Sequence, residues 1–99
     1  MHKLNKTIVC ADGFSMSVQA GTGNYCKPRQ SGADRYTAVE VGFPSHEEPL
    51  LLEYAAEPNH PTETIYAYVP VQVVTDVIAK HGGMIKGEVP AGIPTIWAH

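Results

Sequence analysis

The chain has 99 residues, of which 43% are hydrophobic and 17% are charged, and its formal net charge is −3. A chain of this length is expected to form one domain, and its apolar content makes extensive disorder unexpected. The negative charge argues against duplex nucleic acid as a partner, and the apolar runs fall short of the roughly 20 residues that a membrane-spanning helix needs. We therefore expect a cytoplasmic protein without membrane contact, whose two cysteines, Cys10 and Cys26, stay reduced.

The first elements along the chain are two predicted strands, 7–11 and 14–19, on either side of Asp12-Gly13. Asp-Gly between two extended runs is typical of a two-residue hairpin turn. Such a turn would pair Val9 with Met16, and the alternation of side chains along each strand then defines one apolar face. The residues expected on this face are Val9, Phe14, Met16 and Val18.

Residues 20–34 form a predicted loop, because glycine, proline and asparagine interrupt any regular pattern there. Lys27, Arg29 and the adjacent Arg35 place three of the seven basic residues in this region. Backbone N–H groups in glycine-rich turns can bind an anion, although the loop lacks the GxxxxGK[ST] phosphate motif. One interpretation of the loop 21–35 is thus an anion site, and the other is an ordinary surface loop. The anion site would use Gly21, Gly23, Lys27 and Arg29.

Three further strands are predicted at 36–43, 50–55 and 65–69, where β-branched and aromatic residues gather. Between the first two, Ser45 and Glu48 have the spacing of a helix capping box. Because a proline and a run of leucines follow, we favour a turn that leads into a buried strand over the start of a helix at this place.

The clearest predicted element is a helix that begins at Pro70 and ends with His81, just before two glycines. Proline suits the first helical position, where its missing N–H is not needed, and glycine is common directly after a helix. Asp76 and Lys80 are expected to pair across one turn. The apolar stripe of the helix consists of Val73, Val74, Val77 and Ile78.

This order of elements predicts an α+β fold, in which an antiparallel sheet of about five strands carries one C-terminal helix on one face. Residues 1–83 would form the single domain, and 84–99 would form a tail that is too apolar for solvent around Ile96 and Trp97. The tail is expected to dock on its own domain or on a partner, where it could close a homodimer. The predicted core contains Val9, Phe14, Met16, Val18, Val39, Val41, Val74, Val77 and Ile78.

Tyrosines alternate with small or apolar residues in two of the predicted strands. On a regular strand Tyr66 and Tyr68 would share one face, opposite the face that the helix covers. Tyrosine and arginine are the residue types that dominate interface hot spots, so this open face predicts a partner-binding surface. The alternative is that the tyrosines are half-buried structural residues. The predicted surface consists of Tyr36, Tyr66, Tyr68, Arg29, Arg35 and Trp97.

Signals for catalysis and for metal binding are weak. No recognisable motif surrounds Cys10 or Cys26, and the sequence cannot pair either thiol with a histidine base. Glu57, His60 and Glu63 are spaced three apart, but prolines interrupt the helix that would align them on a metal. We therefore expect no catalytic residue, metal site or cofactor, and a protein that is not an enzyme, with a cysteine-dependent enzyme as a weaker alternative.

The stretches TAVEVGFPS, LLLEYA, PTETIYAYVP and VIAKHGG are similar to those of small uncharacterised proteins encoded by bacteriophages and prophages. The similarity covers Thr7 to Gly83, and no catalytic or binding residue carries over with it. Small phage proteins of this kind often act by binding and block a host factor, which implies a place in the host cell cytoplasm.

From this resemblance we expect an accessory protein that binds a host protein or protein complex and inhibits a bacterial defence, such as CRISPR-Cas, or another host component. Nucleic acid is not the expected partner. The alternative function is the binding of a small ligand or nucleotide by the glycine-rich basic loop 21–35.

Overall fold

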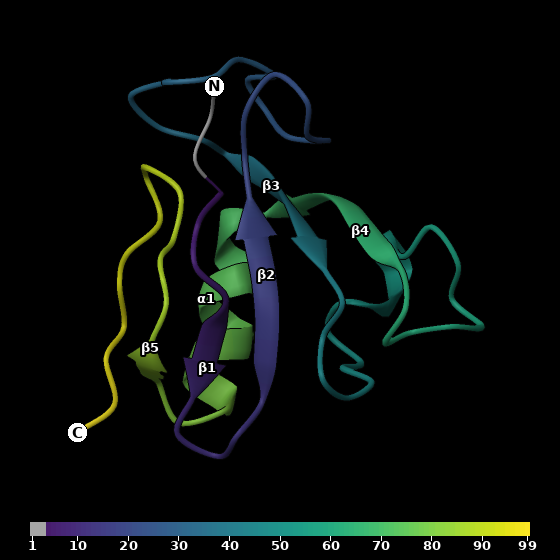
Figure 1. Ribbon diagram of the computed structural model, residues 1–99, viewed down its shortest axis with the longest axis vertical. Coiled ribbons are helices and arrows are strands. Elements are labelled where there is room, and N and C mark those ends of the chain that lie inside the picture. Colours follow the sequence, from purple (N-terminus) through teal and green to yellow (C-terminus); the bar gives the residue numbers. More distant parts are fainter. Residues whose placement is uncertain (1–3) are drawn as a thin grey trace.

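The computed structural model describes residues 4–99 and shows five strands, one α-helix and one turn of 3-10 helix, Leu52–Tyr54. The elements are β1 (Ile8–Cys10), β2 (Ser15–Gln19), β3 (Ala38–Gly42), β4 (Ile65–Pro70), α1 (Val71–Lys80) and β5 (Met84–Lys86). All strand pairs are antiparallel, in the order β4-β3-β2-β1-β5 (Figure 1), so the predicted α+β fold is confirmed. Within residues 4–99, no helix is long and apolar enough to cross a membrane.

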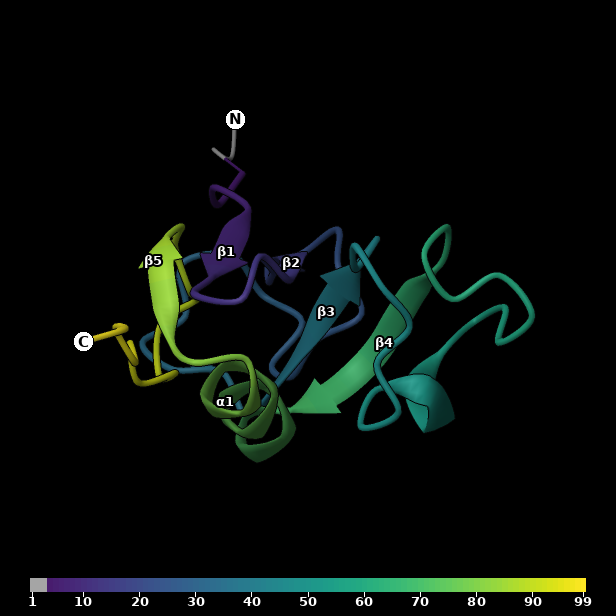
Figure 2. The ribbon, with the colours of Figure 1, turned by 90° about the horizontal axis from the view of Figure 1, so that it is seen from below.

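The core lies between the sheet and α1, and Figure 2 shows the sheet curving around the helix. Val74, Val77 and Ile78 of α1 are fully buried there, as the helical spacing predicts. The expected pair of Asp76 and Lys80 is replaced by other contacts. Lys80 instead reaches Glu48, at 2.9 Å, and Asp76 accepts a hydrogen bond from Gln72.

The β1–β2 hairpin has a three-residue turn in place of the predicted two-residue turn. The Cys10 N–H donates to the Phe14 carbonyl at 2.8 Å, and the Gly13 N–H donates to the Cys10 carbonyl at 2.9 Å. Gly13 has φ +94°, a conformation that glycine adopts at little cost. This arrangement is a tight turn followed by a glycine bulge, a common way to close a hairpin.

The longer turn reverses the two faces of β1. Ile8, and not Val9, is now paired with Met16. Ile8 and Cys10 are therefore fully buried, whereas Val9 is partly exposed. The prediction that Val9 belongs to the core was wrong, and the other predicted core residues of the sheet and helix are buried.

The β4 strand contains a bulge that separates its two tyrosines. Val39 pairs with Val69 and Val41 pairs with Tyr66, so that two residues of β4 oppose the single residue Glu40 of β3. A bulge of this kind bends the strand and changes the direction of a side chain. Tyr66 is consequently fully buried in the core, whereas Tyr68 is 40% exposed. The prediction that they share an open face was wrong.

The predicted strand at 50–55 is also wrong. The Glu48 side chain accepts a hydrogen bond from the Leu50 N–H at 2.7 Å, and the Glu48 carbonyl accepts one from the Leu51 N–H at 3.0 Å. These bonds start a tight turn that continues into the 3-10 helix. Leu51 is buried by the turn itself, so a run of leucines is accommodated here without a strand.

The segment 84–99 lies on its own domain and extends the sheet at the β5 edge (Figure 1). The Met84 N–H donates to the Ile96 carbonyl at 2.7 Å, and the Ala98 N–H donates to the Met84 carbonyl at 2.9 Å. Ile93 is buried, and Ile96 packs against the core. The side chain of Trp97 stays 51% exposed.

Replacing Gly87 by Ala is expected to lower the free energy of unfolding by about 2 kcal/mol or more. Gly87 follows β5 with φ +118°, and a Cβ there would lie 2.5 Å from the Ile8 Cα. Backbone cannot yield as a flexible side chain can, so the edge of the sheet would have to move. Urea denaturation measures the loss. The matched control is Gly23→Ala, where a Cβ meets no atom within 4 Å, and an equal loss in both variants would contradict the prediction.

Candidate binding surface

Two tyrosines from different segments meet beside Glu40. Tyr25 comes from the loop after β2 and Tyr68 from the bulge of β4, and their ring centroids lie 5.9 Å apart at an interplanar angle of 59°. Both side chains are about two-fifths exposed, at 41% and 40%. A cation accompanies each ring, because Lys27 Nζ lies 5.8 Å from the Tyr68 centroid and the Arg29 guanidinium carbon lies 5.0 Å from the Tyr25 centroid. We call Tyr25, Lys27, Arg29 and Tyr68 the cation–tyrosine surface.

Glu40 holds the loop against the bulge. Its carboxylate accepts hydrogen bonds from the Tyr25 N–H at 3.1 Å and from the Asn24 side-chain amide at 3.2 Å. The Tyr25 carbonyl in turn accepts a hydrogen bond from the Tyr68 N–H at 3.0 Å. Backbone groups of both tyrosines are thus fixed relative to each other, and the loop and the bulge place the two rings side by side.

The backbone of Tyr68 is strained, with φ +52°. A non-glycine residue in this region costs of order 1–3 kcal/mol and persists only where the surrounding structure imposes it. Here the bulge and the hydrogen bond to Tyr25 impose it. The consequence is an exposed aromatic ring where a regular strand would have carried the next core residue.

The two cations keep their charged ends available. Arg29 donates a hydrogen bond from Nε to the Thr22 carbonyl at 3.3 Å, and its terminal nitrogens bond none of the residues that the structure describes. Lys27 is fixed through its backbone, which pairs with Ala38 of β3. A cation over an exposed tyrosine ring contributes about 0.5–1 kcal/mol to stability. These contacts therefore orient Lys27 and Arg29 and leave their charges able to interact with other groups.

The structure brings together only two of the six residues predicted for partner binding, Tyr68 and Arg29. Tyr36 is buried and its hydroxyl donates to the Gln30 carbonyl at 2.7 Å, and the buried Tyr66 hydroxyl donates to the Pro61 carbonyl. The expectation that Tyr36 and Tyr66 line an open face was therefore wrong. Burial, and after it the charge of Glu47, raises the pKa of Tyr66, in keeping with a core position.

The other two residues predicted for partner binding, Arg35 and Trp97, are found at the C-terminal segment 84–99. Arg35 sits against Gly92, where a Cβ on the glycine would come within 2.9 Å of the arginine Cβ, and Trp97 is on the last stretch of chain. Sequence reasoning missed Tyr25 and treated Lys27 only as an anion ligand. The sequence did contain a signal for this surface, because an aromatic residue and two cations occupy every second position at Tyr25, Lys27 and Arg29.

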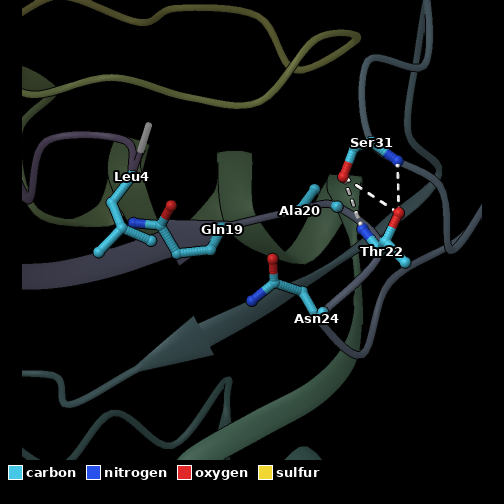
Figure 3. Close-up of a pocket in the computed structure, with 8 residues that line it drawn as sticks. Leu4, Gln19, Ala20, Thr22, Asn24 and Ser31 are labelled. Carbon is cyan, nitrogen blue, oxygen red and sulfur yellow. Dashed lines mark hydrogen bonds between the residues drawn. The ribbon is translucent and has the colours of Figure 1, made fainter. Parts of the chain in front are cut away.

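A hollow of about 270 Å³ lies beside residues 20–24 and 31 of the same loop (Figure 3). Gly21 and Gly23 line it, as the predicted anion site requires, but Lys27 and Arg29 lie on the tyrosine rings instead. The side chains at the hollow are uncharged, and Thr22 and Ser31 hydrogen-bond each other there. Neither Lys27 nor Arg29 lines the hollow, although the Arg29 Nε donates to the carbonyl of Thr22, between the two glycines. The lining residues are Leu4, Gln19, Ala20, Gly21, Thr22, Gly23, Asn24 and Ser31.

A second cluster of titratable groups surrounds His81, at the end of α1. Its Nδ1 lies 2.6 Å from Asp12 Oδ2 and its Nε2 lies 2.8 Å from Glu48 Oε1, while the ring stacks on Phe14 at 4.1 Å. Burial lowers the pKa of His81, but the hydrogen bonds to Asp12 and Glu48 outweigh it and the pKa is raised. Both ring nitrogens donate to carboxylates, so the imidazolium joins the hairpin turn, the 45–50 loop and the helix end.

Glu48 is the buried member of this cluster. Desolvation raises its pKa, but hydrogen bonds from the Leu50 N–H, from Lys80 and from His81 together lower it below the ordinary value. The pKa of Asp12 is also lowered, first by the Phe14 N–H and then by His81. Both nitrogens of the His81 ring are engaged, so the ring offers no free base. We call Asp12, Glu48, Lys80 and His81 the ionic clamp, because their charges join separate segments of the chain.

Both thiols are buried, which bears on the weaker prediction of a cysteine-dependent enzyme. Burial, and after it the charge of Asp12, raises the pKa of the Cys10 thiol to about 11. Cys26 Sγ accepts a hydrogen bond from the Gly21 N–H at 3.3 Å and lies 3.3 Å from the Gly21 carbonyl. Cys10 is therefore protonated at neutral pH, and Cys26 organises the loop.

Alkylation in the absence of reductant is expected to distinguish buried thiols from reactive ones. Folded protein should take up iodoacetamide slowly at Cys10 and Cys26, because only exposed thiolates react quickly. Unfolded protein should take up one alkyl group at each cysteine, as counted by mass spectrometry. Rapid modification of the folded chain would show a reactive thiol, and failure to modify the unfolded chain would show a disulfide.

Comparison with protein-family models, with curated proteins and with solved structures gave no match to this chain.

Proposed function

We propose that this protein acts by binding another protein through the cation–tyrosine surface, without chemistry of its own. The observation that supports this is the juxtaposition of Tyr25 and Tyr68, each accompanied by a cation and each about two-fifths exposed. Tyrosine and arginine are the side chains that most often dominate protein–protein hot spots. A strained backbone at Tyr68 and the anchoring by Glu40 both support a surface that is organised for binding.

The resemblance to phage-encoded proteins supports a host protein or protein complex as the partner. In that setting the binding event would inhibit a bacterial defence or another host component. The nucleotide-binding alternative receives less support, because the side chains that line the hollow at Gly21 and Gly23 are uncharged and both cations lie over the tyrosine rings.

Photo-crosslinking locates the partner on the surface. A benzoylphenylalanine placed at position 25 or 68 should form a crosslink with one protein of the bacterial host, identified by mass spectrometry. The same amino acid at position 43 is the matched control, because Phe43 is also an exposed aromatic residue with positive φ, +48°, but it follows the end of β3 and its N–H donates to the Thr64 carbonyl. Equal crosslinking from all three positions would contradict the proposed surface.

The double variant Tyr25→Ala, Tyr68→Ala should then weaken binding of the crosslinked protein by about 2 kcal/mol or more, as measured by calorimetry. Its fold should stay cooperative, because neither ring belongs to the core. Phe43→Ala should leave the affinity unchanged. A folded double variant that binds at full affinity would remove the support for this surface.

A further inference from the structure

The charge of the cation–tyrosine surface differs from that of the whole chain. The net charge of the protein is −3, yet the surface carries the two cations Lys27 and Arg29. Glu40 lies beside these cations, and it is partly buried with both oxygens occupied by Asn24 and Tyr25. Two cations thus stand beside one carboxylate, which leaves a local excess of positive charge, and local complementarity of charge governs the choice of partner more than the net charge does.

The four side chains also have a definite order. Arg29 lies over Tyr25, Tyr25 meets Tyr68, and Lys27 lies over Tyr68, so each cation accompanies a different ring of the pair. The Arg29 guanidinium is held by its Nε, which leaves its terminal nitrogens for a bidentate contact with a carboxylate. The exposed parts of the two rings supply the apolar area of the surface.

We infer that the partner presents an acidic segment to this surface, with carboxylates that meet Arg29 and Lys27 and an apolar side chain that packs on the two tyrosines. This inference rests on the proposed function and specifies the chemistry of the partner. A single strand of nucleic acid would also offer anions and stacking groups, but it needs cations along the whole length of a groove. Two cations on an acidic protein fit a short run of carboxylates better.

Fluorescence anisotropy with labelled probes tests the inference. The probes are a short peptide rich in Glu, Pro and Tyr, the same peptide with Gln for every Glu, and oligothymidylate. The Glu peptide should bind best, and added salt should weaken it because exposed charges are screened. The double variant Lys27→Gln, Arg29→Gln should weaken it by about tenfold, because it removes two exposed ion pairs, each of modest strength. The matched control is Lys6→Gln, Lys86→Gln, which changes the net charge equally at exposed positions elsewhere.

The outcomes separate this inference from the proposed function. Equal affinity for the Glu and Gln peptides, lost on Tyr25→Ala, Tyr68→Ala, would overturn the acidic segment and leave a protein-binding surface in place. Tighter binding of oligothymidylate would overturn the acidic segment in favour of a nucleic acid partner. No binding of the Glu peptide at millimolar concentration would also overturn it, whereas failure of the crosslinks at positions 25 and 68 counts against the proposed function itself.

Discussion

The double variant Lys80→Met, His81→Gln is expected to lower the free energy of unfolding by about 3–5 kcal/mol. Lys80 and His81 are the two cations on the buried carboxylate of Glu48, at 2.9 and 2.8 Å. Removing both leaves a buried charge without a cationic partner, held only by the Leu50 N–H, and this is the costly way to break a buried ion pair. Urea denaturation near pH 6 measures the loss, with Lys86→Met on the exposed face of β5 as the control.

Adding Glu48→Gln to the double variant should recover a large part of the lost stability. Glutamine keeps the size of the side chain and can still accept the Leu50 N–H, but it carries no charge. Recovery would show that the unpaired charge, and not the missing contacts, was the cause of the loss. A triple variant no more stable than the double variant would contradict an ionic clamp.

The same clamp makes stability depend on pH in both directions. The pKa of His81 is raised from 6.5, so its contribution is complete below pH 6.5 and is lost as the pH rises through the folded-state pKa. The pKa of Glu48 is lowered from 4.5, so its contribution is complete above pH 4.5 and is lost as the pH falls through its folded-state pKa. Maximal stability is thus expected between about pH 4.5 and 6.5, and His81→Gln should remove most of the decline on the alkaline side.

The fold was predictable because its elements are signalled locally. The helix shows an apolar stripe, an initial Pro70 and a glycine stop, and the β1–β2 hairpin shows Asp12-Gly13 between extended runs. Apart from the predicted strand at 50–55, which is a turn and a 3-10 helix, the errors came from single-residue shifts. One extra turn residue reversed the faces of β1, and one bulged residue in β4 separated Tyr66 from Tyr68, because side chains alternate with a period of two.

The candidate site was harder to predict, because it depends on contacts between segments that are distant in sequence. The bond between Tyr25 and Glu40 joins a loop to a strand, and the bond between Tyr68 and Tyr25 joins that loop to the bulge. Neither the bulge nor the loop conformation has a local sequence signature. His81 illustrates the same limit, since its partners Asp12 and Glu48 are 69 and 33 residues away along the chain.

Replacing Tyr66 by Ala is expected to lower the free energy of unfolding by about 3–5 kcal/mol, whereas Tyr68→Ala should change it by less than about 1 kcal/mol. Tyr66 is fully buried, and its hydroxyl bonds the Pro61 carbonyl, so truncation leaves a large cavity and an unpaired group. The Tyr68→Ala variant loses only a partly exposed ring. On a regular strand residues 66 and 68 would lie on the same face, and the two substitutions would have similar effects. Equal losses of unfolding free energy in urea denaturation would therefore contradict the bulge. A loss confined to Tyr66→Ala assigns one ring to the core and leaves the other for a partner.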